Sequence, residues 1–257
     1  MAIHPQAIVD ESAKLGKDVE VGAFSIIGPD VEIGDGTKIM SHVVIKGPTK
    51  IGKNNTIFQF SSVGEDCQDK KYAGEPTRLE IGDNNVIRES CTIHRGTVQD
   101  ESLTKIGNDN LLMAYVHVAH DCVVGSHCIL ANSATLAGHV HVDDYAILGG
   151  GTMVHQFCKI GTQSMSAGGS IVLRDIPAYV MASGQSASAH GLNSEGLRRR
   201  GVDSAHILEL KRAYKVVYRQ GLKLSEALDQ LSSVAETNPY VAEFIKSIQR
   251  SDRGIMR

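Results

Sequence analysis

Tryptophan is absent from this chain of 257 residues, aromatic residues make up only 5% of it, and prolines number six. A core without large rings has to be built from aliphatic side chains, and so few prolines exclude a proline-rich linker. No apolar run approaches the roughly 20 residues of a membrane-spanning helix, so no membrane span is expected. The formal net charge of −3 lacks a basic excess, which argues against a nucleic-acid-binding protein.

Export signals are also missing. The first residues, MAIHPQAIVDES, contain no basic segment followed by an apolar stretch, so we expect no secretory signal and a cytoplasmic location. In that reducing compartment the five cysteines should be free thiols. What the chain does have is 42% hydrophobic and 21% charged residues, as globular domains do.

A period of six residues runs through most of the chain. Stepping by six from Ile3 reaches Val63, the pattern resumes at Ile81, and it runs again from Ile106 to Val172. Of 26 such positions, only Ser166 is not Ile, Leu or Val. Such hexads are typical of a triangular parallel β-helix, with one strand and one turn per hexad. We therefore predict a mainly β fold, a left-handed parallel β-helix of about nine coils stacked ~4.8 Å apart.

The fifth position of each hexad should also face inward, because it holds small residues such as Ala134 and Thr152. The same position is occupied by four of the cysteines: Cys91, Cys122, Cys128 and Cys158. Buried thiols there act as small hydrophobic groups rather than as nucleophiles or metal ligands. Only Cys67 falls outside the frame.

The chain divides into two predicted domains. Residues 1–186 should form the β-helix, with loop insertions near 65–79 and 99–105, and loops on a rigid scaffold often carry function. Residues 187–257 should form a helical domain of three or four helices, because their apolar residues follow helical spacing. This segment contains 12 Lys and Arg against 8 Asp and Glu. Its positive charge suits an acidic partner.

Histidines recur along one edge of the predicted prism. Residues 18 apart lie one above the other, so His120 is followed by Gly138, beside His139, and then by Gln156, beside His155. His117 belongs to the same flank. The alternatives are solvated turn residues and a metal site, but no pattern singles out three ligands, so no metal is predicted. An acid–base site is favoured because imidazole titrates near neutral pH.

Longer motifs identify a family that the repeats alone do not. They include SHVVIKGPTKIG, QDKKYAGEPTRLEIGDNNVIRES, TIHRGTVQ, HVAHDCVVG, LAGHVHVDD, VHQFCKIG, NSEGLRRRG and the terminal RGIMR. With them the chain resembles, essentially end to end, the UDP-N-acetylglucosamine O-acyltransferases that open lipid A biosynthesis in Gram-negative bacteria. The resemblance implies a homotrimer with active sites between subunits. It also implies transfer of an (R)-3-hydroxyacyl group from acyl carrier protein to the 3-hydroxyl of UDP-N-acetylglucosamine, with no cofactor.

The resemblance also assigns roles to individual residues. His120 matches the general base, Asp121 the residue that orients its ring, and Gly138 the backbone donor to the oxyanion. Substrate contacts fall on three segments: Gln68, Asp69 and Lys71 in the first insertion, His117, His139, His155 and Gln156 on the prism edge, and Asn193, Glu195, Arg199 and Arg200 in the tail.

Two positions govern the length of the acyl chain in this family. Gly168 matches the position where glycine permits a longer chain, and Ser186 stands where some members have a histidine that ends the groove. In the first insertion, Lys70 replaces the more usual leucine. The preferred chain length and the use of a 3-amino sugar acceptor stay open.

Three rival functions make different predictions. A related N-acyltransferase of the same pathway carries a uridine-binding domain before its repeats, whereas the hexads here begin at Ile3. A zinc-dependent, carbonic-anhydrase-like prism would contain metal. A non-catalytic scaffold would show no turnover and no effect of replacing His120.

Overall fold

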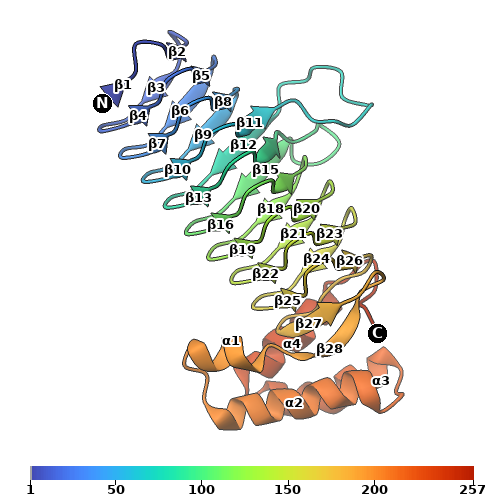
Figure 1. The fold of residues 1–257 in the computed structure, drawn as a ribbon. Coiled ribbons are helices and arrows are strands. Elements are labelled where there is room, and N and C mark those ends of the chain that lie inside the picture. Colours follow the sequence, from blue (N-terminus) through green and yellow to red (C-terminus); the bar gives the residue numbers. More distant parts are fainter. Residues whose placement is uncertain (1) are drawn as a thin grey trace.

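The computed structural model describes residues 2–257, which form a triangular β-helix that ends against a bundle of helices (Figure 1). Each coil contributes one short strand to each of three sheets, which we call A, B and C. Sheet A has the order β1 (Ala2–Ile3), β4 (Glu20–Val21), β7 (Lys38–Ile39), β10 (Thr56–Ile57), β13 (Val86–Ile87), β16 (Leu111–Leu112), β19 (Ile129–Leu130), β22 (Ile147–Leu148), β25 (Met165–Ser166), β27 (Val180–Ser183) and β28 (Ser188–Leu192).

The other two sheets contain only parallel pairs. Sheet B has the order β2 (Ile8–Val9), β5 (Ile26–Ile27), β8 (Val44–Ile45), β11 (Ser62–Glu65), β14 (Thr92–His94), β17 (His117–Val118), β20 (Thr135–Leu136), β23 (Met153–Val154) and β26 (Ile171–Val172). Sheet C consists of β3 (Lys14–Leu15), β6 (Val31–Ile33), β9 (Thr49–Ile51), β12 (Arg78–Ile81), β15 (Leu103–Ile106), β18 (Val123–Val124), β21 (His141–Val142) and β24 (Lys159–Ile160).

The hexad residues form the core, as the period predicts. From Val21 to Val172 every one of them is buried, Ser166 included, and only the three in the first coil are partly exposed. The four cysteines at the fifth position are fully buried, and Cys67 is covered as well. All five are free thiols. Because burying one such aliphatic side chain contributes about 1.5–3 kcal/mol, each added coil extends one continuous core.

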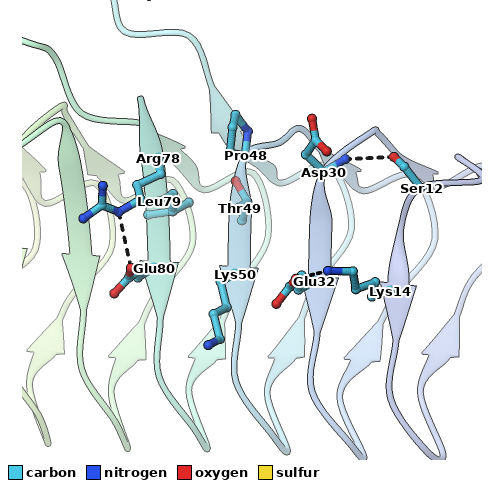
Figure 2. Close-up of a pocket in the computed structure, with 10 residues that line it drawn as sticks. All are labelled: Ser12, Lys14, Asp30, Glu32, Pro48, Thr49, Lys50, Arg78, Leu79 and Glu80. Carbon is cyan, nitrogen blue, oxygen red and sulfur yellow. Dashed lines mark hydrogen bonds and ion pairs between the residues drawn. The ribbon is translucent and has the colours of Figure 1, made fainter. Parts of the chain in front are cut away.

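The outer faces of the three sheets differ in chemistry. On sheet C the outward residues alternate in charge from coil to coil in the order Lys14, Glu32, Lys50, Glu80 and Lys105. Figure 2 shows this face, with the 2.6 Å ion pair between Lys14 and Glu32 lying across two strands. Exposed pairs add little stability, but they keep this face polar.

Sheets A and B instead present apolar strips. The outward row of sheet A nearest the helices reads Val86, Leu111, Ile129, Ile147, Met165 and Met181. Sheet B carries Ile8, Ile26 and Val44 at the opposite, N-terminal end. Phe24 and Phe60, on the corner between these two sheets, are 52% and 63% exposed. Two faces of the prism therefore leave apolar surface in contact with solvent.

Both insertions leave the prism at one corner, where the chain passes from sheet B to sheet C. Residues 66–77 connect β11 to β12, and residues 95–102 connect β14 to β15. His120, between β17 and β18, and His139, between β20 and β21, occupy the same corner in the next two coils. The two loops therefore stand directly beside the histidine edge (Figure 1).

The tail forms the predicted helices after an antiparallel strand, β28, which pairs with β27. The helices are α1 (Ser194–Arg199), α2 (Ser204–Arg219), α3 (Leu224–Ala235) and α4 (Pro239–Gln249). Asn193, Asp203 and Asn238 begin three of them as N-caps. Within residues 2–257, no helix is both long and apolar enough to cross a membrane.

Candidate active site

His120 and Asp121 form a hydrogen-bonded pair at the corner between sheets B and C. His120 Nδ1 lies 2.8 Å from Asp121 Oδ2, and because a carboxylate only accepts, this nitrogen carries the proton. In the neutral imidazole the other ring nitrogen, Nε2, carries no proton and can accept one. The side chain of Asp121 is 1% exposed and that of His120 is 14% exposed. The buried carboxylate thus fixes the tautomer of a histidine that solvent still reaches.

The second insertion donates hydrogen bonds to the Asp121 carboxylate. Thr97 donates to Asp121 twice, from its backbone N–H at 2.8 Å and from its hydroxyl at 2.6 Å. The Thr104 hydroxyl accepts from the Asp121 backbone N–H at 2.8 Å. Burial alone would raise the pKa of Asp121, but the hydrogen bonds from His120 and Thr97 outweigh it, so the pKa is lowered. Asp121 is therefore a fixed anion behind His120.

Gly138 lies against the ring of His120. A Cβ atom at this position would stand 2.5 Å from Cε1 and 2.6 Å from Nε2 of His120. Gly138 is buried, and within residues 2–257 its backbone N–H has no acceptor. Only glycine leaves room for the imidazole beside this free donor.

His139 belongs to a second histidine–aspartate pair. Its Nδ1 lies 2.8 Å from Oδ2 of Asp100, a residue of the second insertion. The ring stacks on Phe157 with 4.4 Å between centroids and meets the His120 ring edge-on at 5.1 Å. Its Nε2 is 3.8 Å from Asp121. The orientation of His139 is therefore set by three different coils.

The remaining edge residues lie around this centre. His117 Nδ1 is 2.7 Å from the Thr92 hydroxyl, and its ring meets that of His94 at 5.0 Å. Burial lowers the pKa of His117 to about 4, so this ring stays neutral. His155 and Gln156 are exposed one coil beyond His139, with His155 Nδ1 3.1 Å from the Gln156 carbonyl.

The loop residues Gln68, Asp69 and Lys71 extend from the same corner and leave their side chains partly or fully exposed. Asp69 accepts from the Lys71 backbone N–H at 2.9 Å. In the described part of the chain, neither the Gln68 amide nor the Lys71 ammonium has a hydrogen-bonding partner. These two side chains are free to meet a substrate above the histidine edge.

The tail residues lie on a different face. Asn193, Glu195, Arg199 and Arg200 border a groove of about 750 Å³ whose other wall is the outer row of sheet A, including Ile129 and Ile147. Because sheet A is not part of the corner that bears His120, one chain does not bring the tail residues and the histidines together.

Within the chain these tail residues have their own contacts. Asn193 caps α1 by accepting from the Gly196 N–H at 3.0 Å, and it donates to the Gln163 carbonyl at 3.0 Å. Glu195 pairs with Arg199 at 3.3 Å. The Arg200 guanidinium stacks over Tyr145 at 4.6 Å. Apart from this pair with Glu195, the Arg199 side chain is 78% exposed.

Gly168, between β25 and β26, and Ser186, between β27 and β28, are both exposed. The Gln185 amide donates to the Gly169 carbonyl at 3.1 Å, which joins the two turns. A Cβ at Gly168 would lie 3.3 Å from the Gly150 carbonyl. Both positions therefore border the helical end of the apolar strip on sheet A.

Three side chains at the histidine corner, those of His120, Asp121 and His139, lie close enough together to hold a metal ion. Potential ligand atoms of His120, Asp121 and His139 lie within 4.8 Å of one another. Both Asp121 oxygens, however, accept from Thr97, and Asp100 engages Nδ1 of His139. Hydrogen bonds therefore occupy both oxygens of Asp121 and Nδ1 of both histidines, and the expectation that no metal is needed stays a prediction.

The hexad pattern did not single out four residues at this corner: Thr97, Asp100, Phe157 and Arg95, whose guanidinium pairs with Asp66 of the first insertion. The 18-residue step could have located Phe157, because it follows His139 by that interval. The other three lie in or beside the second insertion, where the period is interrupted and no such step applies.

Comparison with known proteins adds evidence independent of the geometry. A family model described as Udp N-acetylglucosamine O-acyltransferase, domain 2, matches residues 175–256, and bacterial transferase hexapeptide repeats match residues 12–47 and 103–138. An acyl-[acyl-carrier-protein]–UDP-N-acetylglucosamine O-acyltransferase of Stutzerimonas stutzeri is 59% identical over 255 residues, which is 99% of each chain.

Solved structures agree over the same length. The UDP-N-acetylglucosamine O-acyltransferase of Moraxella catarrhalis is 52% identical, with a TM-score of 0.98 over 100% of both chains. The Arabidopsis UDP-N-acetylglucosamine acyltransferase is 37% identical, with a TM-score of 0.87 over 99% of this chain and 100% of that one. These matches confirm the predicted left-handed β-helix and the predicted resemblance. The chain belongs to the UDP-N-acetylglucosamine O-acyltransferase family.

Proposed function

We propose that this protein transfers an (R)-3-hydroxyacyl group from acyl carrier protein to the 3-hydroxyl of UDP-N-acetylglucosamine, the first step of lipid A biosynthesis. The observation that carries the proposal is the His120–Asp121 pair, whose free Nε2 lies beside Gly138. Full-length relatives named for this reaction support it. The five free cysteines fit a cytoplasmic setting.

The geometry suits general-base acyl transfer. His120 Nε2 removes the proton of the sugar hydroxyl as its oxygen attacks the thioester carbonyl, and Asp121 stabilises the resulting imidazolium. The free N–H of Gly138 donates to the oxyanion of the tetrahedral intermediate. The carbon–sulfur bond then breaks, and the imidazolium gives its proton to the departing thiolate, which leaves as the carrier-protein thiol. Bonds, charges and protons balance without a cofactor, since the thioester supplies the acyl group.

A complete site requires a second copy of the chain. The histidines and the two loops lie at the corner of sheets B and C, whereas the tail residues border sheet A. A single convex edge encloses no substrate, and ligand sites are concave. If sheet A of one copy faces the sheet B side of the next, both apolar strips are covered. Repeating this head-to-tail contact around a threefold axis closes the assembly. We therefore favour a homotrimer.

Charges in the tail suit the two substrates. Arg199 is 78% exposed beside Glu195, and Arg200 stacks over Tyr145, so the two arginines can bind the diphosphate of the nucleotide sugar across the interface. A second groove is lined by Leu192, Leu208 and Tyr214 and by four cationic residues of α2: Lys211, Arg212, Lys215 and Arg219. Acyl carrier protein is acidic, so it should dock on this basic groove.

The proposal is tested by incubating the protein with UDP-N-acetylglucosamine and a series of 3-hydroxyacyl carrier proteins of increasing chain length, and measuring product masses. A matching 3-amino sugar acceptor is included to settle acceptor choice. The wild type should form a singly acylated nucleotide sugar, and His120→Ala should lower turnover by about 10²–10⁴. Formation of no acylated product, or near-normal turnover by a folded His120→Ala variant, would contradict the proposal.

A further inference from the structure

The guanidinium of Arg95 is buried between the two insertions. Its side chain is 8% exposed, and it follows β14, the strand that lies between β11 and β17 in sheet B. Arg95 thus stands one coil from the base of the first insertion and one coil from His120. Buried charges are stable only when they are paired and hydrogen-bonded, so its partners indicate what it does.

One end of the guanidinium is anchored to the prism. Nη1 donates to the Gly47 carbonyl at 2.9 Å and to the Gly64 carbonyl at 2.6 Å. Neither acceptor can easily move. A Cβ at Gly47 would lie 2.0 Å from the Pro29 carbonyl, and one at Gly64 would lie 2.2 Å from the Lys46 carbonyl. These close approaches fix the position of the Arg95 side chain.

The other end of the Arg95 guanidinium contacts two residues of the first insertion. Nη2 pairs with the carboxylate of Asp66 and donates to the Tyr72 hydroxyl at 3.2 Å. The same hydroxyl lies 3.2 Å from Asp66 and 3.0 Å from the Glu75 carbonyl. Asp66 and Tyr72 therefore bracket a short segment whose ends are joined through one guanidinium.

The bracketed segment, residues 66–72, is the one that carries Gln68, Asp69 and Lys71. The Gln68 amide and the Lys71 ammonium have no polar partner in the described part of the chain, so these side chains do not hold the segment in place. Cys67 of this segment is buried. The contacts of Arg95 with Asp66 and Tyr72 are the main polar contacts between the segment and the prism.

We propose that Arg95 is a positioning residue that holds the segment 66–72 in its substrate-binding conformation before the nucleotide sugar arrives. This inference rests on the proposed function. A planar fork with several donors can reach the Gly47 and Gly64 carbonyls, Asp66 and Tyr72 at once, whereas the single ammonium of lysine cannot. Holding a binding segment in place in advance lowers the cost of binding rather than the barrier of the chemical step.

The test compares three variants. Arg95→Lys keeps the charge and loses the fork, and Tyr72→Phe removes one hydroxyl from the tie. Arg78→Lys is the matched control, because Arg78 borders the same insertion but is 53% exposed and, among residues 2–257, its side chain pairs only with Glu80. Trypsin cleaves after Lys70 and Lys71, so limited digestion reports how often the segment opens. Calorimetric binding of UDP-N-acetylglucosamine and steady-state kinetics complete the set.

We expect cleavage after Lys70 and Lys71 to become about ten-fold faster in Arg95→Lys and several-fold faster in Tyr72→Phe. Binding of UDP-N-acetylglucosamine should weaken and its KM should rise by a similar factor, with kcat within about three-fold of the wild type. The Arg78→Lys control should match the wild type throughout. A merely structural role would not produce this separation of KM from kcat.

Wild-type cleavage and binding in a folded Arg95→Lys variant would overturn the inference. If that variant does not fold, Tyr72→Phe decides the question, because wild-type behaviour of Tyr72→Phe would overturn the inference as well. Faster cleavage with unchanged nucleotide binding would also overturn it, because Arg95 would then hold the segment 66–72 without any effect on substrate binding. Failure of the proposed function is seen separately, as an inactive wild type that nevertheless keeps its protected segment.

Discussion

Replacing Gly138 with alanine tests the geometry of the acid–base centre most sharply. Alanine keeps the backbone N–H that we assign to the oxyanion, so only the added methyl group matters. That methyl would stand 2.5 Å from Cε1 and 2.6 Å from Nε2 of His120. Comfortable contacts between such atoms begin near 3.5 Å, so the imidazole has to retreat by about 1 Å. This shift distorts the 2.8 Å bond to Asp121.

A misplacement of about 1 Å at a reacting group costs on the order of 10²-fold in rate. We therefore expect Gly138→Ala to lower kcat by about that factor while the melting temperature and nucleotide binding change little. The assay is release of the carrier-protein thiol at saturating concentrations of both substrates, with circular dichroism to confirm the fold.

A second background isolates the cause. In a His120→Ala protein the methyl group has no ring to displace, so adding Gly138→Ala should cost almost nothing further, and the two effects should be strongly non-additive. A Gly138→Ala variant within about three-fold of wild-type kcat would show that the added methyl group does not displace His120. So would a penalty of equal size in both backgrounds, because the damage would then not pass through His120.

Other predictions follow from neighbouring residues. Gly168→Met should plug the acyl groove and shift the preferred donor a few carbons shorter on a donor series, since each buried methylene contributes about 0.8 kcal/mol; an unchanged preference would remove Gly168 from the groove. Because burial lowers the pKa of His117 to about 4, the unfolded chain takes up a proton there below its ordinary pKa of 6.5 and the folded chain does not. Stability should therefore fall between pH 6.5 and pH 4, and His117→Gln should lose up to about 2 kcal/mol less than wild type at pH 5 in denaturant titrations. Asp100→Ala should release the 2.8 Å bond to His139 and lower kcat/KM about ten-fold, with Asp100→Asn partly restoring it; equal defects in both variants would contradict a hydrogen-bonding role.

The fold could be predicted in detail because one period determines it. Because each coil has a fixed length, residues 18 apart in the sequence are neighbours in space, and this step alone placed His120, Gly138 and Gln156 on one edge. The same arithmetic fails across insertions. The second one adds seven residues to its coil, so Thr92 pairs with His117 at a separation of 25 rather than 18. His94 therefore escaped notice, although it lies against His117.

The support of the site was less predictable for the same reason. Asp100 reaches His139 across 39 residues, from a loop that follows no period. The tail raises a different problem, because helical spacing shows which residues face a core but not which face of the prism the helices cover. The placement of Arg199 and Arg200 beside sheet A emerges only from packing. The antiparallel strand β28, with the sequence SAHGL, also lacks a clear sequence signal.

In the proposed site His120 of one chain acts with the tail of another, and mixed assemblies test this sharing most directly. One inactive variant carries His120→Ala with an intact tail, and the other carries Arg199→Ala and Arg200→Ala with an intact His120. The two are unfolded together, refolded at equal concentrations and assayed for acyl transfer. With random assembly, about one interface in four combines both intact halves. We predict recovery of roughly a quarter of wild-type activity, whereas a mixture no more active than its two components would contradict the shared site.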